Sequence, residues 1–461
     1  VSERVCRVWN PARRSTSASS RAGSARASSA GIGSAAACGD SCAAGRPSAA
    51  RVTTAADVGQ LANLNGTQVV VSGGATLSLP GVTAYTNTSI VDHQYRSLRA
   101  SGTGSVLSLP NLATITNGTN YNTNLSIEAL AGGRVSMPAV TTIQDPNAGD
   151  SRYRSVYVTA SGVGSVIDLS GLQSFSDLYG SLADTNDARF SLLHASAGGT
   201  VLLPTAGSAS WAIDRVQIVL DGTGTMNTSR LTAAFGGILT VSTAADFNAL
   251  ANIDGTAIQV SGGVTMTLPG VTTYTNTATR NNEYRYLRAT GAGSVLGLPN
   301  LTTITNGTAY DTNLRIEALA GGQVRLPVLT AIEDPASGNQ QYRAVWITAD
   351  TADSTVDLSS LSLFRDNSAT VDDGDGRRSR LTISNGATVR LNQSGLSQLQ
   401  GVAVSLAGSI VGGLELLSNG RLSGTGSISG NLRSGGTLTI GSGSTISVGG
   451  NFTAVAGGLL A

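Results

Sequence analysis

Carboxylates and arginines recur at matched positions along the chain, and these are the residue types from which sugar-cleaving sites are built. Hydrolases and lyases that act on polysaccharides need two or three carboxylates converging in one groove, and lyases add a basic residue. The residues that could supply this chemistry are Glu128 and Asp145 with Arg152 or Arg154, and then Glu317 and Asp334 with Arg343.

The near-identical repetition of these two sets argues against catalysis. A duplicated scaffold repeats its structural residues, whereas an active site usually occurs once. Asp145 and Asp334 each precede a proline, and Asp-Pro is a good turn former. We therefore expect turn and surface roles for these residues, no catalytic site, and a chain that is not an enzyme.

Histidine and cysteine offer little further chemistry. His93 and His194 are far apart in the sequence, and the position equivalent to His93 in the second copy described below is Asn282. The three cysteines, Cys6, Cys38 and Cys42, all lie in the first 42 residues, and the spacing of the last two is not that of redox or zinc motifs. We expect neither a metal site nor a catalytic triad from these residues.

One acidic loop could bind calcium. The run 372–376 (DDGDG) has the composition of a Ca²⁺ loop, but Val371 and Thr382 stand where an EF-hand needs its first and twelfth ligands. Asp184 and Asp187 lie at roughly the same place in the first copy. We expect no cofactor, with a loosely bound Ca²⁺ as the alternative to a solvated loop.

The composition favours many thin apolar layers over one large core. Glycine contributes 58 of 461 residues, aromatic residues 4% and charged residues 12%, yet 40% of the chain is hydrophobic. The net charge of +1 predicts no nucleic-acid partner. No apolar run approaches the ~18 residues of a membrane-spanning helix.

A long internal duplication organises the chain. Residues 52–88 return at 241–277, and the same offset of 189 residues holds without a gap as far as Arg154 and Arg343. About three positions in five are identical. Residues 1–50 mix Ser, Ala, Arg and Gly without periodicity, which predicts a disordered tail or translation from a misplaced start. The predicted segments are the tail 1–50, the copies 51–240 and 241–400, and a glycine-rich region 401–461.

Each copy contains a shorter repeat of about 28 to 34 residues, the length of one solenoid coil. Within a unit such as 95–121, apolar and polar residues alternate over short stretches separated by turns, which predicts short strands. The glycines after Asn117 and Asn306 suggest corners of positive φ, and each Pro marks where strand pairing stops. The strand-ending marks are Leu79, Leu109, Met137, Leu169, Leu203, Leu268, Leu298, Leu326, Leu358 and Leu391.

In the unit 95–121 the expected inward residues come in pairs along the strands. The final region alternates cleanly too, and its apolar residues are expected to face one way. The expected inward residues are Leu98, Ala100, Val106, Leu109, Leu112 and Ile115, and then Leu438, Ile440, Ile446 and Val448. The sequence predicts an all-β fold, a parallel β-helix or β-solenoid.

The last 40 or so residues resemble the passenger-associated β-strand repeats of bacterial autotransporters, through 424–431 (GTGSISGN) and 449–460 (GGNFTAVAGGLL). Residues 52–400 are similar to the β-strand repeats of large secreted bacterial proteins. The resemblance implies a right-handed β-helix exported to the cell surface. In that family the repeats continue into further coils and an anchor, so we expect the polypeptide to continue beyond Ala461.

The expected function is structural or adhesive: an extracellular or cell-surface stalk or passenger that presents loops to a glycan, matrix or cell. Tyr-Arg pairs at 95–96, 153–154, 284–285 and 342–343 could stack sugars or cover coil corners. A carbohydrate-active β-helix enzyme and a calcium-stabilised secreted repeat protein are the alternatives. Ice binding would need a threonine pair on every coil, whereas pairs such as those in 113–116 and 302–305 occur on only some.

Overall fold

The computed structural model is all-β in the part of the chain that it describes, and its strands pair in parallel. The predicted tail concerns residues 1–50, of which only 48–50 are described, as the start of the first strand. No described helix is long and apolar enough to cross a membrane. The described residues are 48–54, 56–57, 60–88, 90–178, 190–205, 207–277, 280–368 and 378–460.

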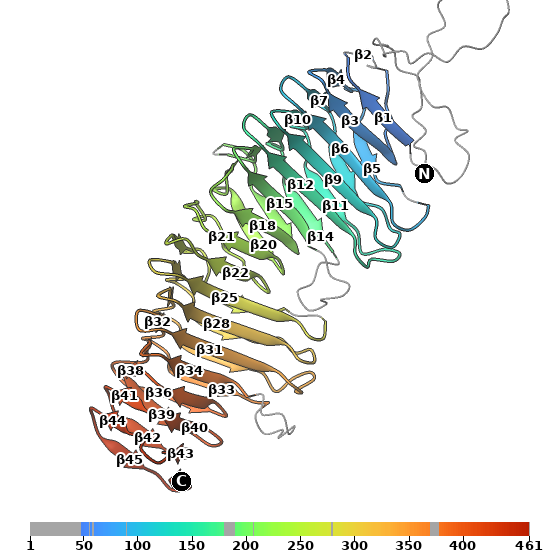
Figure 1. The fold of residues 1–461 in the computed structure, drawn as a ribbon. Helices are drawn as coiled ribbons and strands as arrows, with labels where there is room; N and C mark the ends of the chain where they lie inside the picture. The colour runs from blue at the N-terminus through green and yellow to red at the C-terminus, as the bar shows by residue number, and fades with distance from the viewer. Residues whose placement is uncertain are drawn as a thin grey trace, which may run out of the picture. The chain divides into compact units, whose positions relative to one another are not determined.

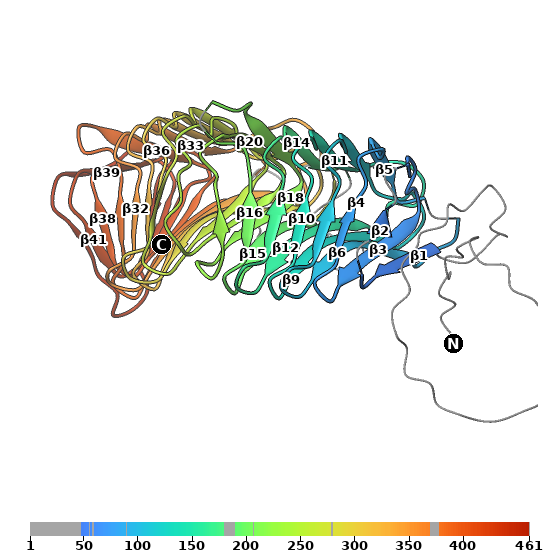
Figure 2. The ribbon, with the colours of Figure 1, turned by 90° about the horizontal axis from the view of Figure 1, so that it is seen from above.

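Most coils contribute one strand to each of three faces, which confirms the predicted parallel β-helix. In the coil that begins with β21 (Ile238–Val241), only that long strand forms before the next long strand, β22 (Ala257–Val260). The chain passes from a longer strand on the long-strand face to short strands on the second and third faces, and then starts the next coil. Figure 1 shows this stacking. Figure 2 shows four long strands side by side on one face: β3 (Thr67–Ser72), β6 (Tyr95–Ser101), β9 (Asn124–Leu130) and β12 (Ser155–Ser161). The fold is the one expected when short apolar strands alternate with glycine- and proline-containing turns.

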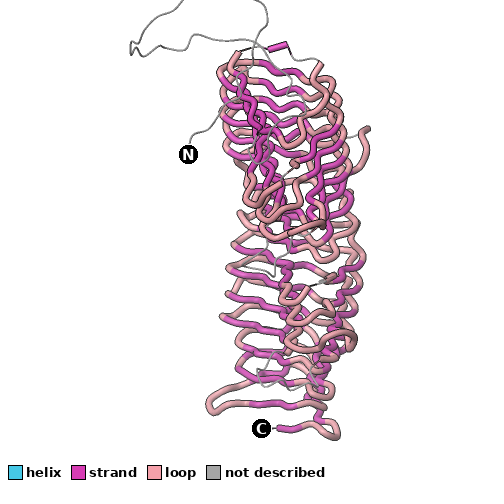
Figure 3. The backbone as a smooth tube through the Cα atoms, turned by 90° about the vertical axis from the view of Figure 1, so that its right-hand side faces the viewer, coloured by secondary structure: helices cyan, strands magenta, loops and turns pink. Residues whose placement is uncertain are grey.

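The described chain divides into two compact units. Unit 1 takes its described residues from 1–172, 194–203 and 223–226, and unit 2 from 173–193, 204–222 and 227–461. Figure 3 shows strands and loops throughout the described parts of both. The strand β15 (Ser191–Ser196) contains residues of both units.

Unit 1 contains three sets of paired strands. Its long-strand face consists of β1 (Ser48–Val52), β3 (Thr67–Ser72), β6 (Tyr95–Ser101), β9 (Asn124–Leu130) and β12 (Ser155–Ser161). Its second face consists of β2 (Ala56–Asp57), β4 (Thr76–Ser78), β7 (Val106–Ser108), β10 (Arg134–Ser136), β13 (Val166–Asp168), β16 (Thr200–Leu202) and β19 (Thr225–Met226). Its third face consists of β5 (Ala84–Thr86), β8 (Thr114–Thr116) and β11 (Thr142–Asp145).

Unit 2 repeats the arrangement. Its long-strand face consists of β18 (Val216–Leu220), β21 (Ile238–Val241), β22 (Ala257–Val260), β25 (Tyr284–Thr290), β28 (Asn313–Leu319), β31 (Ala344–Asp350), β34 (Arg380–Ser384), β37 (Ala403–Leu406), β40 (Arg421–Gly424), β43 (Thr437–Thr439) and β46 (Leu459–Leu460). Its second face consists of β23 (Thr265–Thr267), β26 (Val295–Gly297), β29 (Gln323–Arg325), β32 (Thr355–Asp357), β35 (Thr388–Arg390), β38 (Ser409–Val411), β41 (Gly426–Ile428) and β44 (Ile446–Val448).

The third face of unit 2 follows the same order. It consists of β24 (Thr273–Thr275), β27 (Thr303–Thr305), β30 (Ala331–Asp334), β33 (Leu363–Asp366), β36 (Leu396–Gln400), β39 (Gly413–Leu416), β42 (Leu432–Ser434) and β45 (Phe452–Ala454). The strands β14 (Ser174–Asp177), β17 (Trp211–Asp214) and β20 (Leu231–Phe235) pair with one another and also belong to this unit.

The core consists of inward side chains stacked in register from coil to coil. On the long-strand face of unit 1, Leu98, Ile127 and Val158 lie opposite one another and are fully buried. Most strands bury alternate residues, so each coil contributes a thin apolar layer. The composition predicts this layering.

The Leu-Pro marks lie at coil corners, as predicted. All ten of the strand-ending Leu or Met residues are buried. Leu109 still donates its backbone N–H to Ser136 on the next coil, and pairing then stops at Pro110. Two inward positions were predicted wrongly: Leu107 is buried in place of Val106, and Ile440 is 39% exposed.

Candidate functional site

The first candidate set contains a fully buried ion pair. Asp145 ends β11, and Arg154 lies just before β12; Arg154 Nη2 is 3.3 Å from Asp145 Oδ1, and neither side chain is exposed. Arg154 also donates to the backbone carbonyls of Ala148, at 2.7 Å, and of Pro146. Its guanidinium therefore fastens the loop that begins at Asp145-Pro146.

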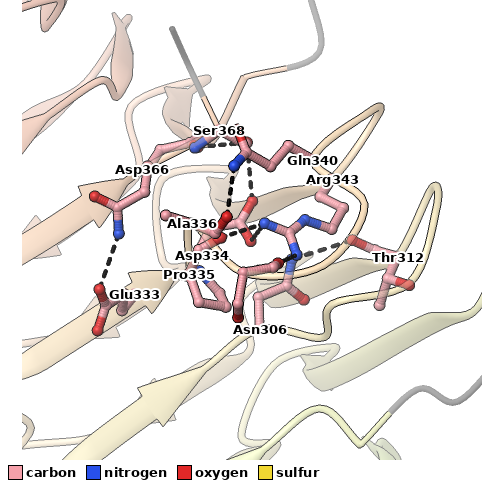
Figure 4. A network of polar contacts seen from close by, with 12 residues as sticks. Asn306, Thr312, Glu333, Asp334, Pro335, Ala336, Gln340, Arg343, Asp366 and Ser368 are labelled. Atoms are coloured by element: carbon pink, nitrogen blue, oxygen red, sulfur yellow. Dashed lines mark hydrogen bonds and ion pairs between the residues drawn. The ribbon is translucent and has the colours of Figure 1, made fainter. Parts of the chain in front are cut away.

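The second copy repeats this arrangement. Arg343 Nη2 is 3.4 Å from Asp334 Oδ1, with both side chains fully buried. Arg343 donates to the carbonyls of Ser337, at 2.8 Å, and of Pro335, as Figure 4 shows for Pro335. These are the contacts of a structural clamp, and a buried charge pair with such hydrogen bonds holds its loop in one conformation.

Asparagines continue the polar network from coil to coil. Asn117 Nδ2 donates to the carbonyls of Thr123 and Ser155, at 2.9 and 3.3 Å, and its Oδ1 accepts from Asn87. Asn306 repeats these contacts in the second copy, where its Oδ1 accepts from Asn276 at 3.1 Å. The positive φ predicted around Asn117 and Asn306 is therefore wrong: these side chains satisfy corner carbonyls inside the coil.

The left-handed backbone positions lie elsewhere, both in the loops before the long strands and in the turns after them. His93 has φ of 57°, and Asn282, its equivalent in the second copy, has φ of 60°. Asn122 Nδ2 lies 2.9 Å from His93 Nδ1, and Tyr121 packs edge-on against the imidazole at a centroid distance of 5.1 Å. The position thus has a corner role that asparagine fills in the second copy. His194 lies in β15.

Ser368 connects Asp334 to a second buried carboxylate, that of Asp366. Ser368 Oγ lies 3.1 Å from Asp334 Oδ2 and 2.6 Å from Asp366 Oδ1 (Figure 4). Burial, followed by the nearby charge of Asp366, raises the pKa of Asp334 to about 7, and Arg343, Ser368 and Asn306 oppose this rise. The carboxyl therefore titrates near neutral pH inside the scaffold.

The other predicted carboxylates have different partners. Glu128 lies on β9 directly opposite Arg99 of β6, whose Nη2 is 2.5 Å from Glu128 Oε2. Glu317 and Arg288 form the same cross-strand pair in unit 2, also at 2.5 Å. These pairs lie on the long-strand face, whereas Asp145 and Asp334 end third-face strands. The structure does not assemble the predicted sets into one group of catalytic residues.

The arginines of the Tyr-Arg pairs do not form exposed platforms for sugars, although Tyr95 is 54% exposed. Their four arginines are at most 6% exposed: Arg96, Arg154, Arg285 and Arg343. The predicted surface role is wrong for these arginines, because their guanidinium groups bind backbone carbonyls inside the coils, as Arg96 Nε does with Gly66 at 2.7 Å. Arg152, the alternative arginine of the first candidate set, is not part of a Tyr-Arg pair and binds Asp150 at 2.6 Å on the surface.

Several predicted residues lie outside the described part of the chain. These are the three cysteines and the acidic residues of the candidate calcium loops at 184–187 and 372–376. Within the described residues, no group of three or more His, Cys, Asp or Glu side chains could hold a metal ion. On the third face, threonines do not recur at the same position on every coil. Thr303 and Thr305, for example, lie opposite Ala331 and Glu333 on the next coil.

A column of aligned outward side chains on the long-strand face of unit 2 was not predicted from the sequence. Tyr286 lies opposite Arg315, and Arg315 lies opposite Trp346. Comparison of the two copies at the 189-residue offset could have found it, because unit 1 has Ser97 and Ser126 where unit 2 has Tyr286 and Arg315.

No family model, no curated protein and no solved structure matches this chain.

Proposed function

We propose that this chain is a non-enzymatic, exported or cell-surface β-solenoid with a structural or adhesive role. The supporting observation is that every candidate carboxylate with a described position is part of the scaffold. Asp145 and Asp334 have no exposed surface, and a group that cannot reach solvent cannot reach a polysaccharide.

The equivalence of the two copies supports the same proposal. The pairs Asp145–Arg154 and Asp334–Arg343 make the same contacts with their own loops, and Glu128–Arg99 and Glu317–Arg288 make the same cross-strand contacts. Residues that recur with identical partners in a duplicated chain hold each copy together. The function then lies in what the outer surface presents.

Export to the cell surface is part of the proposal and rests on the resemblance of segments 424–431 and 449–460 to passenger repeats. The resemblance agrees with the parallel coil of the final strands, where β40 pairs with β43 and β43 with β46. An antibody against the chain should label intact producing cells or recover the chain from their medium. Recovery only after lysis would contradict this part of the proposal.

Adhesion itself is tested with beads that carry the full chain. We expect beads to be retained under flow on at least one surface of a panel of glycans and matrix proteins, well above albumin-coated beads. The eluted buffer should contain no released sugar fragments. Retention equal to that of albumin on every surface, or retention accompanied by steady release of fragments, would contradict the proposal.

A further inference from the structure

A column of alternating aromatic and arginine side chains crosses the outer side of the long-strand face of unit 2. The strand register places Tyr286, Arg315, Trp346 and Arg380 opposite one another on β25, β28, β31 and β34. Their side chains are half-buried or exposed, because inward and outward residues alternate along each strand.

The indole ring of Trp346 contacts the side chains of the two arginines on the neighbouring strands and holds them in place. The guanidinium carbons of Arg315 and Arg380 lie 4.9 and 5.2 Å from the Trp346 ring centroid. The indole Nε1 donates to the backbone carbonyl of Arg378 at 3.2 Å. Cation–π contacts at such distances hold the arginine side chains in place.

The same column continues at the next coils. Arg380 lies opposite Ala403, and Ala403 lies opposite Arg421 of β40. Arg315, Arg380 and Arg421 therefore occupy every second strand, and we call these three residues the arginine column. Neighbouring strands are about 4.8 Å apart, so consecutive members are separated by about 10 Å along the stack.

The neighbouring outward positions suit a polar, anionic chain. Next to the arginine column runs a line of hydroxyl groups, on Thr348, Thr382, Ser405 and Ser423. The carboxylates on this side of β25 to β40 are bound already: Glu317 by Arg288, and Asp350 by Ser384 and Asn385 at 2.7 Å each.

The first copy shows that the fold does not require the column. Its positions equivalent to Tyr286 and Arg315 carry Ser97 and Ser126, and Tyr157 lies at the position of Trp346. The flanking Arg99–Glu128 pair is the same as in unit 2. Scaffold contacts were thus kept in both copies, and the outward residues beside them differ. Such a difference is expected where the outer surface of unit 2 binds a ligand.

We propose that the arginine column binds a linear acidic polysaccharide that carries a carboxylate or sulfate on alternate sugars. The chain would lie along the strand stack, with its anionic groups at Arg315, Arg380 and Arg421 and its hydroxyl groups at the threonines and serines. The inference rests on the proposed adhesive function and specifies its ligand. Nucleic acid fits less well, because its phosphates follow one another at about 3.4 Å per strand.

Titration of the full chain with hyaluronan, an acid-bearing polymer of alternating sugars, tests the proposal. Trp346 fluorescence should change on binding, because its ring lies between two of the arginines; the change should vanish in Trp346→Phe. Arg315→Ser, which installs the residue of the first copy, should weaken binding roughly tenfold at low salt. The triple variant R315S/R380S/R421S should not bind, and added salt should weaken the wild type.

Arg325→Ser is the matched control, because Arg325 is an exposed arginine of the same unit on the second face. It should bind hyaluronan like the wild type, and neutral dextran should bind to no variant. Melting curves check folding, and Arg421→Ser alone, at an exposed position, serves if the triple variant is unstable.

Three results would overturn the inference: no binding of hyaluronan to the wild type, unchanged binding in the folded variants, or tighter binding of duplex DNA than of hyaluronan. Bead adhesion that persists in the triple variant would overturn the arginine column alone and leave the adhesive function standing. Loss of all bead adhesion in the wild type would count against both.

Discussion

Ser368 lies between two buried carboxylates and has one hydroxyl hydrogen to donate. Asp366 already accepts the backbone N–H groups of Ser368 and Ser379, at 2.9 and 2.7 Å. If Ser368 donates its hydroxyl hydrogen to Asp366, its contact with Asp334 is a hydrogen bond only when Asp334 carries a proton. The geometry and the raised pKa of Asp334 therefore agree.

This carboxyl makes stability depend on pH. The pKa of Asp334 is raised from 3.8 to about 7 on folding, so the folded chain retains a proton that the unfolded chain has lost. Its contribution is fully present below pH ~4 and is lost as the pH rises toward ~7, an effect on the order of a few kcal/mol. Relative to Asp334→Asn, the wild type should lose melting temperature between pH 5 and 8.

The control for this prediction is Asp350→Asn. Hydrogen bonds from Ser384 and Asn385 lower the pKa of Asp350, a half-exposed group that stays ionised over this range. The Asp350→Asn variant should show the same slope of melting temperature against pH as the wild type. A constant difference between wild type and Asp334→Asn from pH 5 to 8 would show that Asp334 is ionised throughout.

At the scale of elements, glycines just before second-face strands let neighbouring coils approach. A Cβ at Gly322, which directly precedes β29, would lie 2.3 Å from the carbonyl oxygen of Ala289 in the preceding coil. Gly133 and Gly199 have the same restriction toward Ala100 and Ala160. The close approach involves backbone atoms, so side-chain movement cannot relieve it.

Gly322→Ala should therefore lower stability by at least about 1–3 kcal/mol, the cost of overpacking. Gly441→Ala is the comparison: its Cβ would meet nothing closer than Ser444 Oγ at 3.6 Å. That change should leave stability unaltered or raise it by up to about 1 kcal/mol through the unfolded state. Urea unfolding of both variants measures the difference, and equal effects would contradict the account.

The sequence predicts the coiled fold but not the polar contacts between side chains inside the coils. Period-two alternation and the Leu-Pro marks predict strands and corners because both follow from local chain geometry. The Asp145–Arg154 clamp depends on how a third-face strand meets the loop after it, which repeat length does not determine. Asn117 shows the same limit: Asn-Gly suggests a turn, whereas its side chain joins residues on neighbouring coils.

The duplicated chain also separates what the scaffold needs from what its surface offers. Both copies keep the clamp arginines Arg154 and Arg343 inside the coils. The outward positions changed, from Ser126 in unit 1 to Arg315 in unit 2. A repeat protein tolerates such changes because each coil is stabilised by its neighbours' inward and backbone contacts.

The assignment of the buried carboxylates to the scaffold is tested most directly by measuring new sugar ends. Wild type and the Asp145→Asn/Asp334→Asn double variant are incubated with a panel of acidic and neutral polysaccharides at a temperature where both are folded. We predict the same background level of new ends from both proteins. Depolymerisation by the wild type that the double variant loses would contradict the account and establish a carbohydrate-active enzyme.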